Sequence, residues 1–158
     1  MNKSSVEIVL FYCTHQREPV DRISKELKAS GGAEVRQVAL PCSGKLEVFQ
    51  LTKALESGAD GVALFACPEG DCRYMVGSAR ARGRVAYTGR ILEEIGLERD
   101  RVRRFVLESQ PRAENGEEIF EWLEKIKGLK DIHPGFKAPR ISGGSEEMED
   151  QRDQGQKY

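Results

Sequence analysis

Four cysteines are the residues of this chain best suited to chemistry, and their spacing is informative. Cys13, Cys42 and Cys67 each end a short apolar run typical of a β-strand, and Cys72 follows Cys67 in the same loop. Helical patterns separate the runs, so we expect parallel strands, whose carboxyl ends meet at one edge of an open sheet. Four thiolates gathered there would form the ligand set of an iron–sulfur centre, which makes electron transfer the leading hypothesis.

Two other uses of cysteine are weaker alternatives. A thiol oxidoreductase would use Cys67 or Cys72 as nucleophile with His15 as base, but the second thiol then has no role. Structural zinc usually takes ligands from paired C-x2-C turns, and the sequence contains none, so a zinc-stabilised assembly subunit is less favoured. Free cysteines are also often no more than buried apolar residues. Because three of these four end equivalent strands, this explanation is less favoured for the set as a whole.

The elements that must position these thiols alternate between strand and helix patterns. This order predicts an α/β fold with right-handed crossovers: a small flavodoxin-like sheet of four parallel strands, in the order 2-1-3-4, flanked by helices. The expected strands are 6–13, 34–42, 61–66 and 102–107. The first two expected helices are 19–28 and 48–55, the second ended by Gly58, and the third is an arginine-rich stretch that ends before Gly96. A last helix is expected to be capped by Asn115 or Gly116. Its apolar stripe consists of Ile119, Phe120, Leu123 and Ile126, with Trp122 at the flank.

Length and composition narrow the classes of protein. The 158 residues suit one iron–sulfur electron-transfer domain, residues 1–132, and a polar C-terminal tail, residues 133–158, that is disordered alone or bound to a partner. The 25 basic and 26 acidic residues nearly cancel, so bulk charge does not favour nucleic acid as a partner. No stretch approaches the ~20 apolar residues needed to span a bilayer, and the amino terminus lacks a signal peptide, so we expect a cytoplasmic protein without membrane insertion.

The segment after Cys72 is rich in arginine and begins with apolar residues. The charges form either a solvated helix face or a docking patch for an acidic partner surface, and the apolar residues are suitable interface material. Glycines near the cysteines are expected to let the backbone approach the sulfurs. The arginines are Arg73, Arg80, Arg82, Arg84 and Arg90, the apolar residues are Tyr74, Met75 and Val76, and the glycines are Gly44, Gly70 and Gly77.

Several motifs within about residues 5 to 128 together resemble a known family. They are Cys13 after an apolar strand, the sequence PCSGK at 41–45, GADGV at 58–62, CPEGDCRY at 67–74, and RV at 84–85 before ILEEIG at 91–96. The chain resembles the delta subunit of methyl-viologen-reducing hydrogenase, an iron–sulfur protein of methanogens that recurs beside heterodisulfide-reductase-like enzymes.

The resemblance implies a non-catalytic subunit of an oxidoreductase complex in anaerobic metabolism. It would hold one 2Fe-2S cluster and relay electrons between a redox enzyme, such as a hydrogenase or formate dehydrogenase, and a flavin-bearing heterodisulfide-reductase-A-like subunit. The family commonly has a C-x2-C at the first strand end, whereas this chain has Gln16 at the second position, and His15 is a further residue there able to ligate iron. The ligands implied by position are Cys13, Cys42, Cys67 and Cys72.

Overall fold

The protein folds around one parallel sheet. The structure is a computed structural model that describes residues 5–30, 32–107 and 114–132. Within these residues the strands lie in the order β2-β1-β3-β4, as the sequence predicts, and all pairings are parallel. The strands are β1 (Val6–Cys13), β2 (Ala33–Leu40), β3 (Gly61–Ala66) and β4 (Val102–Val106).

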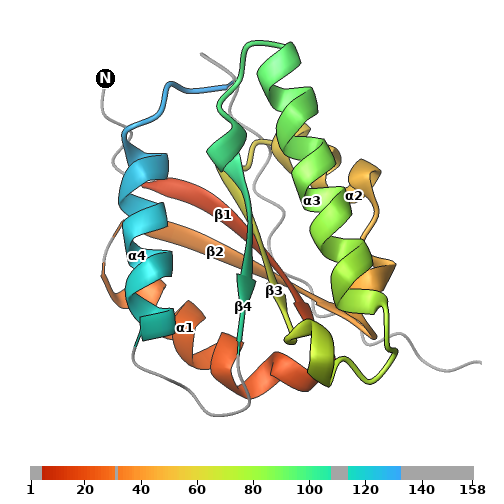
Figure 1. The fold of residues 1–158 in the computed structure, drawn as a ribbon. Helices are drawn as coiled ribbons and strands as arrows, with labels where there is room; N and C mark the ends of the chain where they lie inside the picture. The colour runs from red at the N-terminus through yellow and green to blue at the C-terminus, as the bar shows by residue number, and fades with distance from the viewer. Residues whose placement is uncertain (1–4, 31, 108–113, 133–158) are drawn as a thin grey trace, which may run out of the picture.

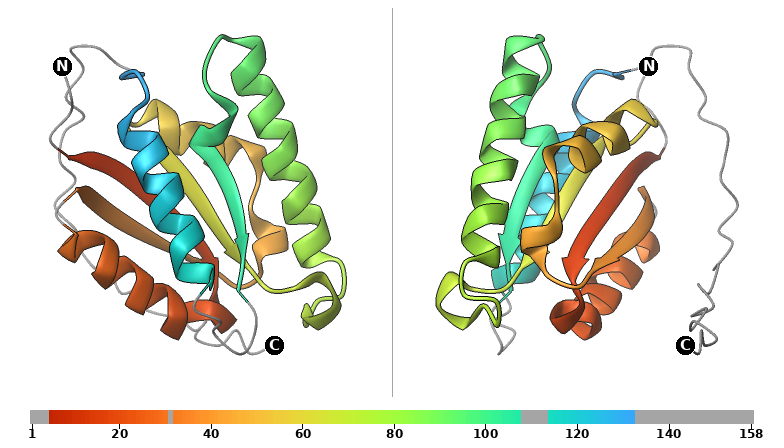
Figure 2. Two further views of the ribbon diagram at one scale, coloured as in Figure 1. Left: turned by 60° about the vertical axis from the view of Figure 1, so that its left-hand side comes forward. Right: turned by 90° about the vertical axis from the view of Figure 1, so that its right-hand side faces the viewer.

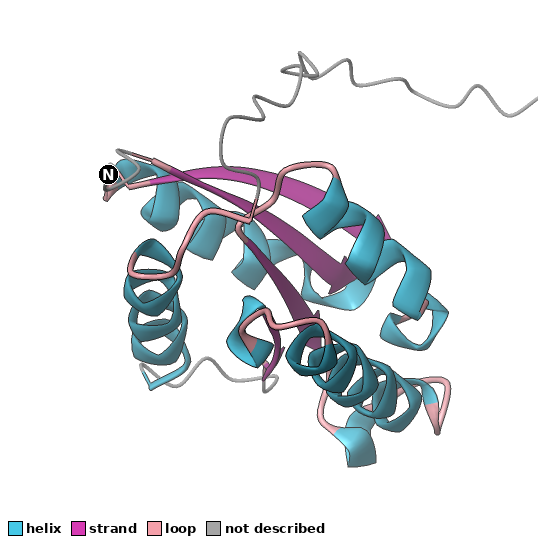
Figure 3. Cartoon of the chain, turned by 90° about the horizontal axis from the view of Figure 1, so that it is seen from above, coloured by secondary structure: helices cyan, strands magenta, loops and turns pink. Residues whose placement is uncertain are grey.

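Helices cover both faces of the sheet (Figures 1 and 3). The helices α1 (Arg17–Ala29) and α4 (Glu114–Lys127) lie on one face, and α2 (Val48–Glu56) and α3 (Gly77–Glu94) lie on the other, which Figure 2 shows from two sides. In the described part of the chain, four short 3-10 helices lie in the connections between strands and helices: η1 (Thr14–Gln16), η2 (Ser43–Lys45), η3 (Glu69–Asp71) and η4 (Arg99–Arg101). Three of these follow the carboxyl ends of strands and carry the candidate site.

The strand β3 is central and buried along its whole length, which explains why its sequence is apolar without alternation. Its residues pack alternately into two cores. Phe65 joins the core under α1 and α4, where it stacks on Phe105, and Leu64 joins the core under α2 and α3. A layer of helices therefore covers the middle of the sheet on each face.

Helix ends agree with the sequence at two glycines and differ at the last helix. Gly58 and Gly96 have positive φ angles of 108° and 81°, a conformation that glycine adopts without steric cost just after α2 and α3. The last helix begins at Glu114, so neither Asn115 nor Gly116 precedes it as a cap.

The apolar stripe of α4 also differs from the sequence interpretation. Trp122 is 1% exposed and packs edge-on against Phe105, whereas Phe120 is only half-buried. The indole N–H of Trp122 donates to the carbonyl of Asp100 at 2.6 Å, so a tryptophan with a satisfied polar end occupies the centre of the stripe.

The strands all point to the same end of the molecule (Figure 1). Cys13 is in register with Leu40, and Tyr12 with Phe65, so the loops that follow β1, β2 and β3 leave the sheet side by side. None of the helices in the described residues is long and apolar enough to cross a bilayer. The expected tail, residues 133–158, lies outside the described residues.

Candidate functional site

All four cysteines line one cavity at the carboxyl edge of the sheet. The cavity has a volume of about 420 Å³, and His15, Gln16 and Tyr74 are also among its lining residues. Two of the thiols are buried and two are half-buried, and all four are free: Cys13, Cys42, Cys67 and Cys72. The structure therefore brings together the residues that the strand-end argument singled out.

The thiols are arranged as two pairs. Cys13 and Cys67 stand at the ends of neighbouring strands, and their thiols lie close enough for Cys67 to raise the pKa of Cys13. Cys42 and Cys72 lie in the loops after β2 and β3, where both sulfurs face Gly77, and Cys42 lowers the pKa of Cys72. Within the described part of the chain, no three His, Cys, Asp or Glu side chains converge closely enough to hold a single metal ion.

The two pairs differ in their electrostatic surroundings. Burial raises the pKa of the Cys13 thiol, and the neighbouring Cys67 raises it further, against the opposing effect of the His15 backbone N–H. Burial also acts to raise the pKa of Cys72, but backbone N–H groups, including those of Ser78 and Gly77, lower it overall. The thiol of Cys72 is thus more readily ionised than that of Cys13.

Backbone packing between η2 and the start of α3 holds the second pair together. A Cβ atom added at Gly77 would overlap the Sγ of Cys42 and lie 3.3 Å from the Sγ of Cys72, and one added at Gly44 would lie 2.6 Å from the Cα of Gly77. Only glycine fits at these two positions. Gly70 differs from the sequence expectation, because nothing lies within 4 Å of its added Cβ.

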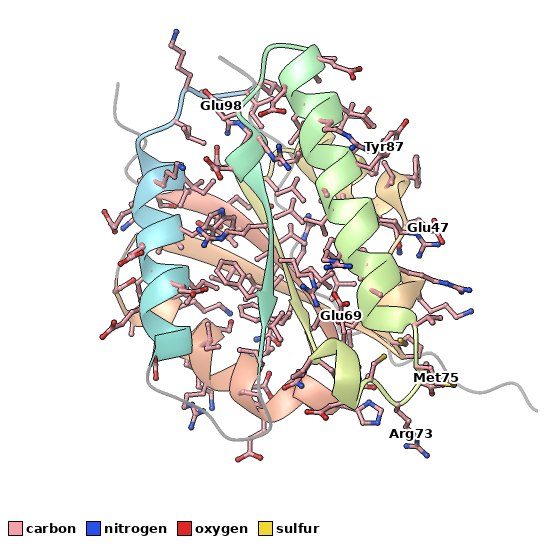
Figure 4. The ribbon with its side chains drawn as sticks, viewed as in Figure 1. Glu47, Glu69, Arg73, Met75, Tyr87 and Glu98 are labelled. Carbon is pink, nitrogen blue, oxygen red and sulfur yellow. The ribbon has the colours of Figure 1, made fainter. Side chains whose placement is uncertain are left out.

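Arg84 fixes the loop that carries Cys42. From α3 its guanidinium donates to the carbonyls of Gly44 at 2.6 Å and Leu46 at 2.9 Å, and it pairs with Glu47 at 3.0 Å. Figure 4 shows Glu47 beside α3. The expectation that Arg84 belongs to a docking patch is wrong, because its charge and donors are used inside the protein.

Arg104 on β4 supports the loop that carries Cys67. Its guanidinium donates to the hydroxyl of Ser78 at 2.9 Å, and Ser78 donates in turn to the carbonyl of Cys67 at 2.5 Å. Glu69 lies 3.6 Å from Arg104 and 3.2 Å from Arg82. Burial lowers the pKa of Arg104, the Glu69 carboxylate opposes this, and the charge of Arg82 lowers it further.

Two residues that follow Cys13 contact the sulfurs of the first pair. His15 Nδ1 lies 3.5 Å from the Sγ of Cys13, so the imidazole contacts this thiol and is not the partner of Cys67 or Cys72 that a thiol oxidoreductase would need. Gln16 is buried, and its side-chain amide donates to the Sγ of Cys67 at 3.4 Å and to the carbonyl of Leu107 at 3.3 Å.

Sequence reasoning missed the roles of Gln16, Arg84 and Arg104. For Gln16 a signal exists, because it stands where the resembling family commonly has a cysteine. For the two arginines no signal exists, since neither the arginine-rich helix that holds Arg84 nor the strand that holds Arg104 reveals which side chain reaches another loop.

An exposed apolar loop lies at the mouth of the cavity. Tyr74, Met75 and Val76 are 55%, 82% and 49% exposed. Met75 has a φ angle of 57°, which is unusual for a residue with a side chain, and its N–H donates to the carbonyl of Cys72 at 2.8 Å. Figure 4 shows Met75 and Arg73 projecting outward at this end of the molecule.

Comparison with known proteins gives a consistent set of relatives. The chain matches the family described as methyl-viologen-reducing hydrogenase, delta subunit, over residues 8–130. The iron-sulfur D subunit of the F420-non-reducing hydrogenase from Archaeoglobus profundus is 33% identical over 119 residues, which are 75% of this chain and 73% of that protein. The vhc iron-sulfur D subunit from Methanococcus voltae is 38% identical over 110 residues, 66% of this chain and 65% of that protein.

A larger protein contains a similar region. The A subunit of the ferredoxin:CoB-CoM heterodisulfide reductase from Methanosarcina mazei is 26% identical over 114 residues, which are 72% of this chain but only 14% of that protein. In that relative, a region like this chain is thus joined to a much longer polypeptide.

Proposed function

Since the chain belongs to the methyl-viologen-reducing hydrogenase delta-subunit family, we propose that it is an electron-transfer subunit whose four cysteines hold one 2Fe-2S cluster. Held by Cys13, Cys42, Cys67 and Cys72, such a group would supply one-electron transfer between a reduced donor centre and an oxidised flavin. The residues of the chain itself bind, orient and shield this group. No side chain is proposed to act on a substrate.

The gathering of all four thiols around one cavity, two at neighbouring strand ends and two against Gly77, is the observation that carries the proposal. A 2Fe-2S cluster with four cysteine ligands uses two thiolates on each of its two irons. Cys13 and Cys67 would ligate one iron, and Cys42 and Cys72 the other. A single zinc ion would need four ligands around one point, which the described residues do not provide.

Backbone groups at the second pair also suit an anionic group. The N–H of Gly44 donates to the Sγ of Cys42 at 3.4 Å, and the bare Cα of Gly77 lies against both sulfurs. Such donors stabilise negative charge on sulfur, and their closeness leaves no space for a larger residue.

We further propose that the electron acceptor is a flavin-bearing protein similar to the A subunit of heterodisulfide reductase, and that the donor is a hydrogenase, a formate dehydrogenase or a comparable enzyme. The heterodisulfide reductase relative that contains a region like this chain supports the first assignment. The exposed loop of Tyr74, Met75 and Val76 at the cavity mouth is the surface proposed to meet the flavoprotein.

Anaerobic purification followed by iron and sulfide analysis and electron paramagnetic resonance tests this function. The expected result is about two irons and two sulfides per chain and a signal that develops on one-electron reduction. Stoichiometric zinc, or protein purified without oxygen that neither contains nor accepts iron and sulfide, would overturn the proposal.

A further inference from the structure

Gln16 is the polar side chain that reaches a candidate ligand sulfur from a different strand end. It is 8% exposed and lies in η1, directly after β1. Its amide nitrogen is 3.4 Å from the Sγ of Cys67, after β3, and 3.3 Å from the carbonyl oxygen of Leu107, after β4. One buried amide therefore joins the ends of three strands.

The chemistry of its neighbours fixes the orientation of this amide. A backbone carbonyl only accepts hydrogen bonds, so the NH₂ group of Gln16, and not its oxygen, must face Leu107. The same NH₂ group then offers its second hydrogen to Cys67. A thiolate at Cys67 is an acceptor, and the two donations use both hydrogens of the amide.

We propose that Gln16 sets the reduction potential of the cluster by donating this hydrogen bond to the Cys67 sulfur; the inference rests on the function proposed above. Reduction adds one negative charge, part of which lies on the ligand sulfurs. A fixed N–H donor stabilises the reduced form more than the oxidised form and raises the potential.

The burial of Gln16 makes the donor effective. A hydrogen bond is stronger electrostatically in a site with little water than at the surface, and a charged acceptor strengthens it further. Cys42 receives its N–H from the backbone of Gly44, which a side-chain substitution does not remove, whereas the donor to Cys67 is a side chain that can be replaced.

Gln16→Met tests the inference, because methionine fills a similar volume and has no N–H. We expect the reduction equilibrium constant to fall about tenfold, which is about 59 mV to lower potential for one electron. Iron and sulfide content should remain that of the unaltered protein. The control is Gln37→Met, at a half-buried position in β2 that is not among the residues lining the cavity, which should leave the potential unchanged.

A measurement on the unaltered protein covers the case in which Gln16→Met does not fold. Protein with ¹⁵N in its glutamine side chains should show nitrogen hyperfine coupling to the reduced cluster. A protein that has its cluster but shows no such coupling, or Gln16→Met with its cluster and an unchanged potential, would overturn the role of Gln16 alone. An unaltered protein that takes up no iron would instead overturn the proposed function, and this inference with it.

Discussion

The two thiol pairs are positioned by different means. Cys13 ends β1, and Cys67 directly follows the neighbouring strand β3, so sheet register brings them together. Side chains from η1 contact both sulfurs. Cys42 and Cys72 lie in loops, which strand pairing does not position. Close packing at Gly44 and Gly77 and the hydrogen bonds of the Arg84 guanidinium hold these loops instead. The comparison teaches that the first pair depends on the fold, whereas the second depends on a few specific contacts.

Loss of one thiol from either pair should have the largest effect. Cys67→Ser and Cys42→Ser each leave one iron with a poor ligand, so we expect most of the visible absorption and of the bound iron to be lost. Iron content and absorption spectra measure this, with the exposed Ser57→Ala as control. Unchanged spectra in both cysteine variants would contradict ligation by these pairs.

Gly77→Ala should separate the second pair without removing a thiol. The new Cβ overlaps the Sγ of Cys42, and overpacking of this kind costs about 1–3 kcal/mol. We expect reduced iron content and a lower unfolding temperature.

Gly83→Ala in the same helix is the matched control, because nothing lies within 4 Å of its added Cβ and alanine favours a helix over glycine by about 1 kcal/mol. It should stabilise the protein and keep the iron. Equal iron content in both glycine variants would show that packing at Gly77 does not position the pair.

These contacts mark the limit of what the sequence predicts. The apolar runs of β1 and β3 predict their burial and strand order, because a strand covered on both faces leaves a direct pattern, and the strand ends then place the thiols. No pattern reveals that Arg84 reaches Gly44 while Arg80 stays exposed, since both lie in one arginine-rich helix. Whether an arginine side chain reaches another loop depends on the distance between the two elements, and the periodicity of the sequence carries no information on that distance.

Arg84→Met should loosen the Cys42 loop. It removes charged hydrogen bonds to the Gly44 and Leu46 carbonyls, each worth about 1.5–3 kcal/mol, and leaves Glu47 without this partner. We expect faster loss of iron to a chelator, with partial recovery in Arg84→Lys, which keeps the charge but not the forked geometry.

Arg80→Met is the control for this variant, because Arg80 is exposed in the same helix. Its rate of iron loss should equal that of the unaltered protein. If Arg80→Met and Arg84→Met lose iron equally fast, helix charge and not the loop contact would be responsible.

Neutralising exposed charge near the cavity should have the smallest effect on the site. Arg73→Gln combined with Arg80→Gln should slow association with the flavoprotein partner several-fold at low salt, and less at physiological salt, where charges are screened beyond ~8 Å. Stopped-flow or surface-binding rates at several salt concentrations measure this. Iron content should not change, and a salt-independent association rate would argue against an acidic partner surface.

Disulfide mapping of the iron-free protein tests the pairing of the thiols most directly. Mild oxidation with diamide, which accepts the two electrons and two protons released for each disulfide, should join the two thiols of each pair. Mass spectrometry of the digested protein should then find Cys13 linked to Cys67 and Cys42 linked to Cys72. Predominant Cys13–Cys42 or Cys67–Cys72 links would contradict the two pairs and the assignment of one pair to each iron.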